Sequence, residues 1–206
     1  MKRVRIDNRW ITVFGLFVAV SIWGQDLAQT TEQSDVSKIL RASGTLYVRE
    51  SYQLVDVATT GANPIEFEVV ILKTLVAKDV LSPSATTTVG VRLEIEEEYS
   101  ERSAYLDIEE AEGLLASLRK ISSEGMAILT TPVADGIERA ARSSEIHYTT
   151  KEEISMGAFV RRGVLIFALK VSSRAEWAIL AERGVRALET NLSRAIEIAA
   201  AVVDGG

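Results

Sequence analysis

The chain lacks cysteine and has one histidine and three prolines among its 206 residues. Without cysteine, disulfides, thiol nucleophiles and a lipid-modified cysteine are excluded, and a single histidine leaves out the usual zinc ligand sets. The prolines, Pro64, Pro83 and Pro132, lie far apart and indicate separate turns instead of a proline-rich linker. Stability must therefore come from packing.

The apolar and charged contents, 47% and 25%, are typical of a globular chain and not of a disordered one. The length is enough for one domain with a substantial core. We expect a single α+β domain over residues 44–203, with a polar tether containing at most a helical turn at residues 25–43.

The amino-terminal segment has the order of a secretory signal. An uncharged run at residues 10–24 follows four basic residues, which are Lys2, Arg3, Arg5 and Arg9. The run is shorter than the roughly 20 residues of a membrane-spanning helix. We predict a signal peptide over residues 1–24, cleavage near Gln25, and a periplasmic or secreted protein. An uncleaved segment that contacts the membrane is the alternative. Export without disulfides favours a bacterial envelope protein.

Acidic residues dominate the predicted mature chain. Residues 1–24 carry four basic and one acidic side chain, so 19 basic and 28 acidic side chains remain and the net charge is −9. This charge repels phosphate backbones, and the pair Arg161 and Arg162 is too small a basic patch to overcome it. We expect no nucleic-acid partner.

Apolar periodicity predicts strands followed by a helix, twice. In the first half, strands are expected near residues 46–55, 65–72, 89–95 and 104–107. A helix then starts at Asp107, whose spacing to Glu110 is that of a capping box, and should end by Gly125. A short helix is possible from residue 132 to residue 142.

In the second half, strands are expected near residues 146–148, 154–160, 164–171 and 177–179, before a helix through Ala199. Gly157 is interpreted as a bulge and Gly163 as a hairpin turn. The fold class is α+β, with antiparallel sheets and two main helices. Whether the similar halves, residues 44–125 and 143–203, are a true internal repeat stays open.

The segment Tyr105-Leu-Asp-Ile-Glu-Glu-Ala-Glu-Gly-Leu-Leu, with Ile146-His-Tyr-Thr-Thr, resembles a group of exported bacterial proteins of unknown function. That resemblance spans residues 44–200 and implies no activity and no site residues. The strands-then-helix layout is also similar to that of the Whirly and Pur-type single-strand nucleic-acid binders. Acidic charge and export argue against carrying over their function.

Candidate reactive residues are few. His147 lies on a strand face opposite Ile146 and Tyr148, which predicts an ordinary surface histidine. An acidic cluster could supply paired carboxylates or calcium ligands, but it lacks the spacing of a calcium loop and suits a solvated sheet face with a helix cap. Its members are Glu94, Glu96, Glu97, Glu98, Glu101, Asp107, Glu109, Glu110 and Glu112.

Aromatic residues are spread along the predicted strands, which favours packing over a ligand platform. They are Tyr47, Tyr52, Tyr105, Phe159, Phe167 and Trp177. We assign no catalytic, cofactor-binding or metal-binding residue and expect no cofactor. The leading hypothesis is an exported, non-enzymatic binding or structural module whose partner is a protein or a small ligand. A carboxylate-based hydrolase is the alternative, and single-strand nucleic-acid binding comes last.

Overall fold

The computed structural model describes residues 33–76, 84–130 and 145–204, which belong to one compact unit of the chain, residues 31–206. The predicted signal peptide, the first part of the predicted tether and the possible short helix at residues 132–142 lie outside the described residues.

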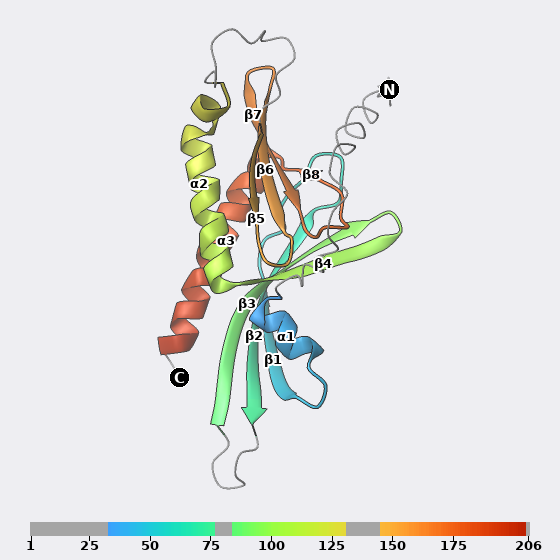
Figure 1. Ribbon diagram of the computed structural model, residues 1–206, viewed down its shortest axis with the longest axis vertical. Coiled ribbons are helices and arrows are strands. Elements are labelled where there is room, and N and C mark those ends of the chain that lie inside the picture. The colour runs from blue at the N-terminus through green and yellow to red at the C-terminus, as the bar shows by residue number, and fades with distance from the viewer. Residues whose placement is uncertain (1–32, 77–83, 131–144, 205–206) are drawn as a thin grey trace, which may run out of the picture. The chain divides into compact units, whose positions relative to one another are not determined.

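The described residues form two antiparallel four-stranded sheets and three helices (Figure 1). The first sheet contains, in spatial order, β1 (Leu46–Gln53), β2 (Ile65–Val76), β3 (Ser84–Glu97) and β4 (Ser100–Asp107). The second contains β5 (Glu145–Thr149), β6 (Ser155–Arg161), β7 (Val164–Lys170) and β8 (Ala178–Ile179). The helices are α1 (Asp35–Arg41), α2 (Ile108–Thr130) and α3 (Glu182–Asp204). The predicted α+β fold, with strands before a helix in each half, is confirmed.

Residue alternation determines which face of the first sheet is buried. Phe67 in β2 lies opposite Leu93 in β3, and both are fully buried. The next pair, Glu68 and Arg92, points to the opposite face because successive side chains alternate across a strand. The first sheet therefore has one apolar face against the main core, and its other face carries charged side chains beside the apolar patch that α1 covers.

Each long helix contacts the sheet of the other half. Helix α2 follows the first sheet in sequence and contacts β3 and β4 of that sheet as well as β5, β6 and β7 of the second, whereas α3 follows the second sheet and contacts β3. The two helices also contact each other (Figure 1). A single apolar core includes Phe67 and Leu93 from the first sheet, Met156 from the second, Leu114 from α2 and Leu188 from α3. The halves are therefore joined by shared burial.

Helix α2 is longer than the sequence predicts. It continues through Gly125 to Thr130, so the predicted end at Gly125 is wrong. Gly125 is buried within the helix, and a Cβ atom there would lie 3.0 Å from Ile121 Cγ2 and 3.4 Å from the Leu165 side chain of β7. The glycine therefore avoids a close approach to Ile121 and does not end the helix.

Residues 35–41 differ from the expected tether because they form the docked helix α1. Val36 is fully buried, and it packs with Val70 and Leu72 on the face of the first sheet that points away from the main core. Gly90 of β3 makes this close approach possible, since a Cβ atom there would lie 2.5 Å from Val36 Cγ2.

Two glycines of the second sheet have different roles. Gly163 has a φ of 76° and follows Arg162, whose φ is 53°, in the predicted hairpin turn between β6 and β7. Gly157 pairs in regular register with His147 and Ala168, so the predicted bulge is absent from this described strand. A Cβ atom at position 157 would lie 3.3 Å from the Trp177 ring, which explains the glycine by packing.

Candidate functional site

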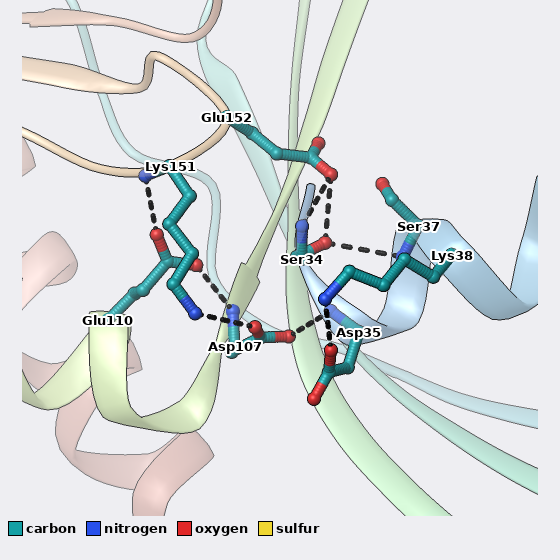
Figure 2. A network of polar contacts seen from close by, with 8 residues as sticks. All are labelled: Ser34, Asp35, Ser37, Lys38, Asp107, Glu110, Lys151 and Glu152. Carbon is teal, nitrogen blue, oxygen red and sulfur yellow. Dashed lines mark hydrogen bonds and ion pairs between the residues drawn. The ribbon is translucent and has the colours of Figure 1, made fainter. Parts of the chain in front are cut away.

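Three carboxylates join α1, the β4–α2 junction and the β5–β6 turn (Figure 2). They are Asp107 at the end of β4, Glu110 in the first turn of α2, and Glu152 in the turn between β5 and β6. We call this set the carboxylate junction. Asp107 and Glu110 were singled out in the sequence, whereas Glu152 was missed because its role depends on partners distant in the chain.

Glu152 connects the two halves through both carboxylate oxygens. Its Oε1 accepts hydrogen bonds from Ser34 Oγ at 2.8 Å and from the Ser34 backbone N–H at 3.2 Å. Its Oε2 accepts from the backbone N–H of Tyr105 in β4 at 3.1 Å. Ser34 in turn caps α1, because its Oγ accepts from Ser37 N–H (Figure 2). Glu152 thus holds the start of α1 against the edge of β4.

Glu110 also accepts backbone hydrogen bonds from two directions. Its Oε2 accepts from Asp107 N–H at 3.0 Å, the contact that the capping-box spacing predicts, and its Oε1 accepts from Lys151 N–H at 2.6 Å. The second contact joins α2 to the β5–β6 turn. The buried charge of Glu110 therefore stabilises both the start of a helix and a contact between the halves.

The side chain of Asp107 caps a different helix from the one expected. Its Oδ1 accepts from Asp35 N–H of α1 at 2.8 Å, and Lys151 Nζ lies 3.6 Å from its Oδ2 (Figure 2). Burial raises the pKa of Asp107, although its backbone hydrogen bonds and Lys151 act in the opposite direction. A raised carboxyl pKa is common at catalytic sites, but here the carboxylate is held by backbone N–H groups of neighbouring elements.

The acidic face near the β3–β4 hairpin is partly neutralised. Arg92 forms ion pairs with Glu94, with Glu68 at 3.6 Å and with Glu101 at 3.4 Å. Arg102 lies 3.5 Å from Glu97, and Glu97 also accepts from the backbone N–H of Glu176 at 2.8 Å. The two sets of ion pairs lie on opposite faces of the sheet, and they hold the acidic side chains within the fold.

Two adjoining grooves border that hairpin, with volumes of about 740 Å³ and about 480 Å³. They share Asn63 and the run Glu96–Glu98, and the smaller groove is also lined by Trp177. Neither groove is lined by Asp107 or Glu110. The buried carboxylate with the raised pKa and the two grooves are therefore separate features, and the grooves do not supply a substrate space beside it.

His147 lies on the exposed face of β5, as predicted. Its Nε2 lies 2.9 Å from Glu145 Oε2, and its ring meets the edge of Trp177 at a centroid distance of 5.8 Å. Trp177 is 40% exposed, and Gly157 provides the space beneath it. Within the described residues, no group of three or more His, Asp or Glu side chains is placed to hold a metal ion.

Strand β1 carries the most exposed apolar row of the first sheet. Leu46, Val48 and Tyr52 alternate along it and are 66%, 48% and 47% exposed. Leu75 lies opposite Leu46 in β2 and extends the row. Of the aromatic residues expected to pack in the core or on a sheet, Trp177 packs on the second sheet against Gly157 and His147, whereas Tyr52 is 47% exposed because β1 lies at a sheet edge, which the sequence does not show.

No described helix has the length and apolar character needed to cross a membrane. No protein-family model matches the chain, and comparisons with curated proteins and with solved structures give no match either.

Proposed function

We propose that this chain is an exported, non-enzymatic module of the bacterial envelope that binds an extended polypeptide strand along the open edge of β1. The observation that carries the proposal is the combination of exposed backbone and exposed apolar side chains on one strand. In the described part of the chain, β1 ends the strand order of its sheet and pairs only with β2. An unpaired edge presents a row of N–H and C=O groups that another strand can satisfy.

The other described sheet edges are protected. At β4, the Glu152 carboxylate already accepts from the Tyr105 N–H. Strand β5 is five residues long and exposes polar side chains, and β8 has two residues. Strand β1 is eight residues long and contains no proline or lysine, two residues that commonly block pairing at edges. Of the described edges, it is the one suited to accepting a partner strand.

The roles of the carboxylates support a module without catalysis. A carboxylate-based hydrolase needs an acid that can exchange a proton with a substrate in an accessible space. Asp107, Glu110 and Glu152 accept hydrogen bonds from the backbone of neighbouring segments. Their contacts stabilise the joined halves, and this structural role accounts for the burial of Asp107 and Glu110 without invoking a reaction.

Export is supported by the order of charges and apolar residues in the first 24 residues. The test is fractionation of cells that express the chain, with sequencing of its amino terminus. We expect a periplasmic or secreted form that begins near Gln25. Recovery of the full-length chain from the cytosol would contradict export.

Site-specific photo-crosslinking in cells tests strand binding. A photoreactive phenylalanine analogue replaces Ser51, an exposed residue of β1, in one variant. It replaces Val164, which is 61% exposed in β7, in the control. We expect a polypeptide adduct from position 51 and none from position 164. Adding Val48→Lys to the first variant should abolish the adduct, because it places a flexible charge on the binding row.

Two results would contradict the proposal. One is the absence of any polypeptide adduct at position 51. The other is an adduct of equal yield at both positions, since that would indicate random collision instead of a docking edge.

A further inference from the structure

We infer that the strand bound by β1 is the β1 strand of a second copy of this chain, paired antiparallel about Glu50. This inference rests on the proposed use of the β1 edge. The pairing would join two four-stranded sheets into one continuous sheet with two-fold symmetry. Such an interface is isologous, because each copy contributes the same surface.

Apolar residues along and just after β1 are spaced symmetrically about Glu50. Val48 and Tyr52 lie two residues to either side. Leu46 lies four residues before Glu50, and Leu54, which follows β1 and packs partly against the main core, lies four residues after it. In an antiparallel pair centred on Glu50, Val48 of each copy faces the partner's Tyr52, and Leu46 faces the partner's Leu54. These residues share one sheet face because side chains two apart point the same way. Apolar and aromatic cross-strand pairs of this kind stabilise a sheet.

Two-fold symmetry restricts the possible registers. A residue on the axis lies opposite itself, so every facing pair must come from the same sheet face. Centring on Glu50 meets this condition and pairs all four apolar positions with apolar positions. Centring on Arg49 would instead place Val48 opposite a glutamate. The register about Glu50 is therefore the favoured one.

The charges of β1 are already balanced within one copy. Glu50 accepts from Lys73 Nζ at 2.9 Å, and Arg49 forms an ion pair with Glu68 at 2.9 Å on the other face. At the axis, the two carboxylates would come with two ammonium groups. Pairing thus brings no uncompensated like charge together, as a self-complementary edge requires.

A foreign peptide has no need of this symmetry. A heterologous strand would require apolar positions on β1 but not their mirrored spacing about a central residue. Because the pairing uses one eight-residue strand edge, the surface area that it buries is that of a small protein–protein interface. We therefore expect a reversible dimer whose population depends on protein concentration.

Sedimentation velocity of the purified chain over a range of concentrations measures the association. We expect a monomer–dimer equilibrium in the unchanged chain and in Val164→Lys. Val48→Lys should weaken the dimer by at least about tenfold, because the change occurs twice in a symmetric interface. Both substituted valines are exposed strand residues, so folding should be equally preserved, and circular dichroism checks this.

Disulfide trapping tests the register. The natural chain has no cysteine, so one introduced cysteine defines the crosslink. Residues opposite each other in an antiparallel pair have Cα atoms about 4.5–5.5 Å apart, within the range that a disulfide spans. We expect Glu50→Cys to give a covalent dimer on mild oxidation at much higher yield than Val164→Cys.

A chain that stays monomeric at all concentrations, or equal trapping at positions 50 and 164, would overturn the inference. The photo-crosslinking result separates this failure from that of the proposed function. An adduct at position 51 with a different protein would leave strand binding intact while excluding the second copy as the partner. No adduct at position 51 would overturn both.

Discussion

The contact between the two halves depends on the side chains of a few residues. Glu110 and Glu152 each accept hydrogen bonds from the backbone of two different segments, and Asp107 joins β4 to α1. A buried backbone N–H that loses its acceptor costs about 1–3 kcal/mol. Side chains of these three residues therefore contribute more to the fold than their number would suggest.

Truncation of Glu110 tests this role. Glu110→Ala removes the acceptors of Asp107 N–H and Lys151 N–H, so the free energy of unfolding should fall by about 2–4 kcal/mol. Glu110→Gln keeps one carbonyl oxygen and should cost less. Denaturant unfolding measures both. The control, Glu109→Ala on the exposed side of the same turn, should change stability by about 0.5 kcal/mol or less. Equal effects at the two positions would contradict the junction.

The pH dependence at Asp107 has a defined sign. Burial raises its folded pKa above the ordinary value of 3.8, against the opposing effect of Lys151. Its stabilising contribution is therefore fully present below pH 3.8 and is lost as the pH rises through the folded pKa. Asn at this position does not titrate, so the stability of Asp107→Asn relative to the natural chain should increase from acid to neutral pH.

Unfolding curves of the natural chain and Asp107→Asn at matched pH values measure this difference, and other titrating groups cancel in the comparison. A difference that falls with increasing pH would show that attraction by Lys151 outweighs burial.

Local patterns predicted the residue roles only in part. The spacing of Asp107 and Glu110 predicted the backbone contact at the start of α2, and alternation placed His147 on the exposed face. The actual partner of the Asp107 side chain, Asp35, lies 72 positions away in sequence. The position of the Trp177 ring likewise depends on Gly157, which becomes its neighbour only in the folded sheet.

Among the elements, α1 depends most on tertiary contacts. Its seven residues are too few to form a stable helix alone. Val36 anchors it beside Gly90, and Glu152 and Asp107 hold its first turn. For this reason, a polar segment that the sequence predicts to be a tether becomes ordered.

Val36→Ala tests how α1 is held. The cavity and the lost burial should lower the free energy of unfolding by about 1–3 kcal/mol. Because α1 has few other apolar contacts, its amides should exchange hydrogen faster than those of α3 in this variant. Val164→Ala, at an exposed position, serves as the matched control and should change neither quantity. Unchanged exchange in α1 would show that the carboxylates alone hold the helix.

Periodicity predicted the existence of elements better than their ends. The strands of both sheets and the two long helices follow apolar patterns that are local in sequence. The end of α2 was missed because Gly125 lies inside the helix, where a Cβ atom would approach Ile121 closely. A glycine that ends a helix and a glycine that permits close packing look the same in one sequence.

At the scale of the whole described unit, each long helix contacts the sheet of the other half. Helix α2 contacts both sheets and α3 contacts β3 of the first, so the two halves share one apolar core. The similar order of strands and helix in the two halves could be predicted from sequence. The contacts between the halves could not, because apolar stripes on α2 and α3 show that the helices are buried but not which sheets they contact.

The strand order within each sheet was also hidden in the sequence, and it decides the functional proposal. Leu46, Val48 and Tyr52 show the alternation of a half-buried strand. Their exposure follows from the position of β1 at the end of the sheet. Function is therefore proposed from an edge that becomes visible only when the sheet is assembled.

Amide hydrogen exchange of the natural chain at low and high protein concentration tests the β1 edge most directly. We predict that the amides of residues 46–53 become more protected as concentration rises, because a second strand accepts their outward-facing N–H groups. Residues 145–149 of β5, at another sheet edge, should exchange at the same rate at both concentrations. Equal exchange of residues 46–53 at all concentrations, or equal protection of both strands, would contradict the account.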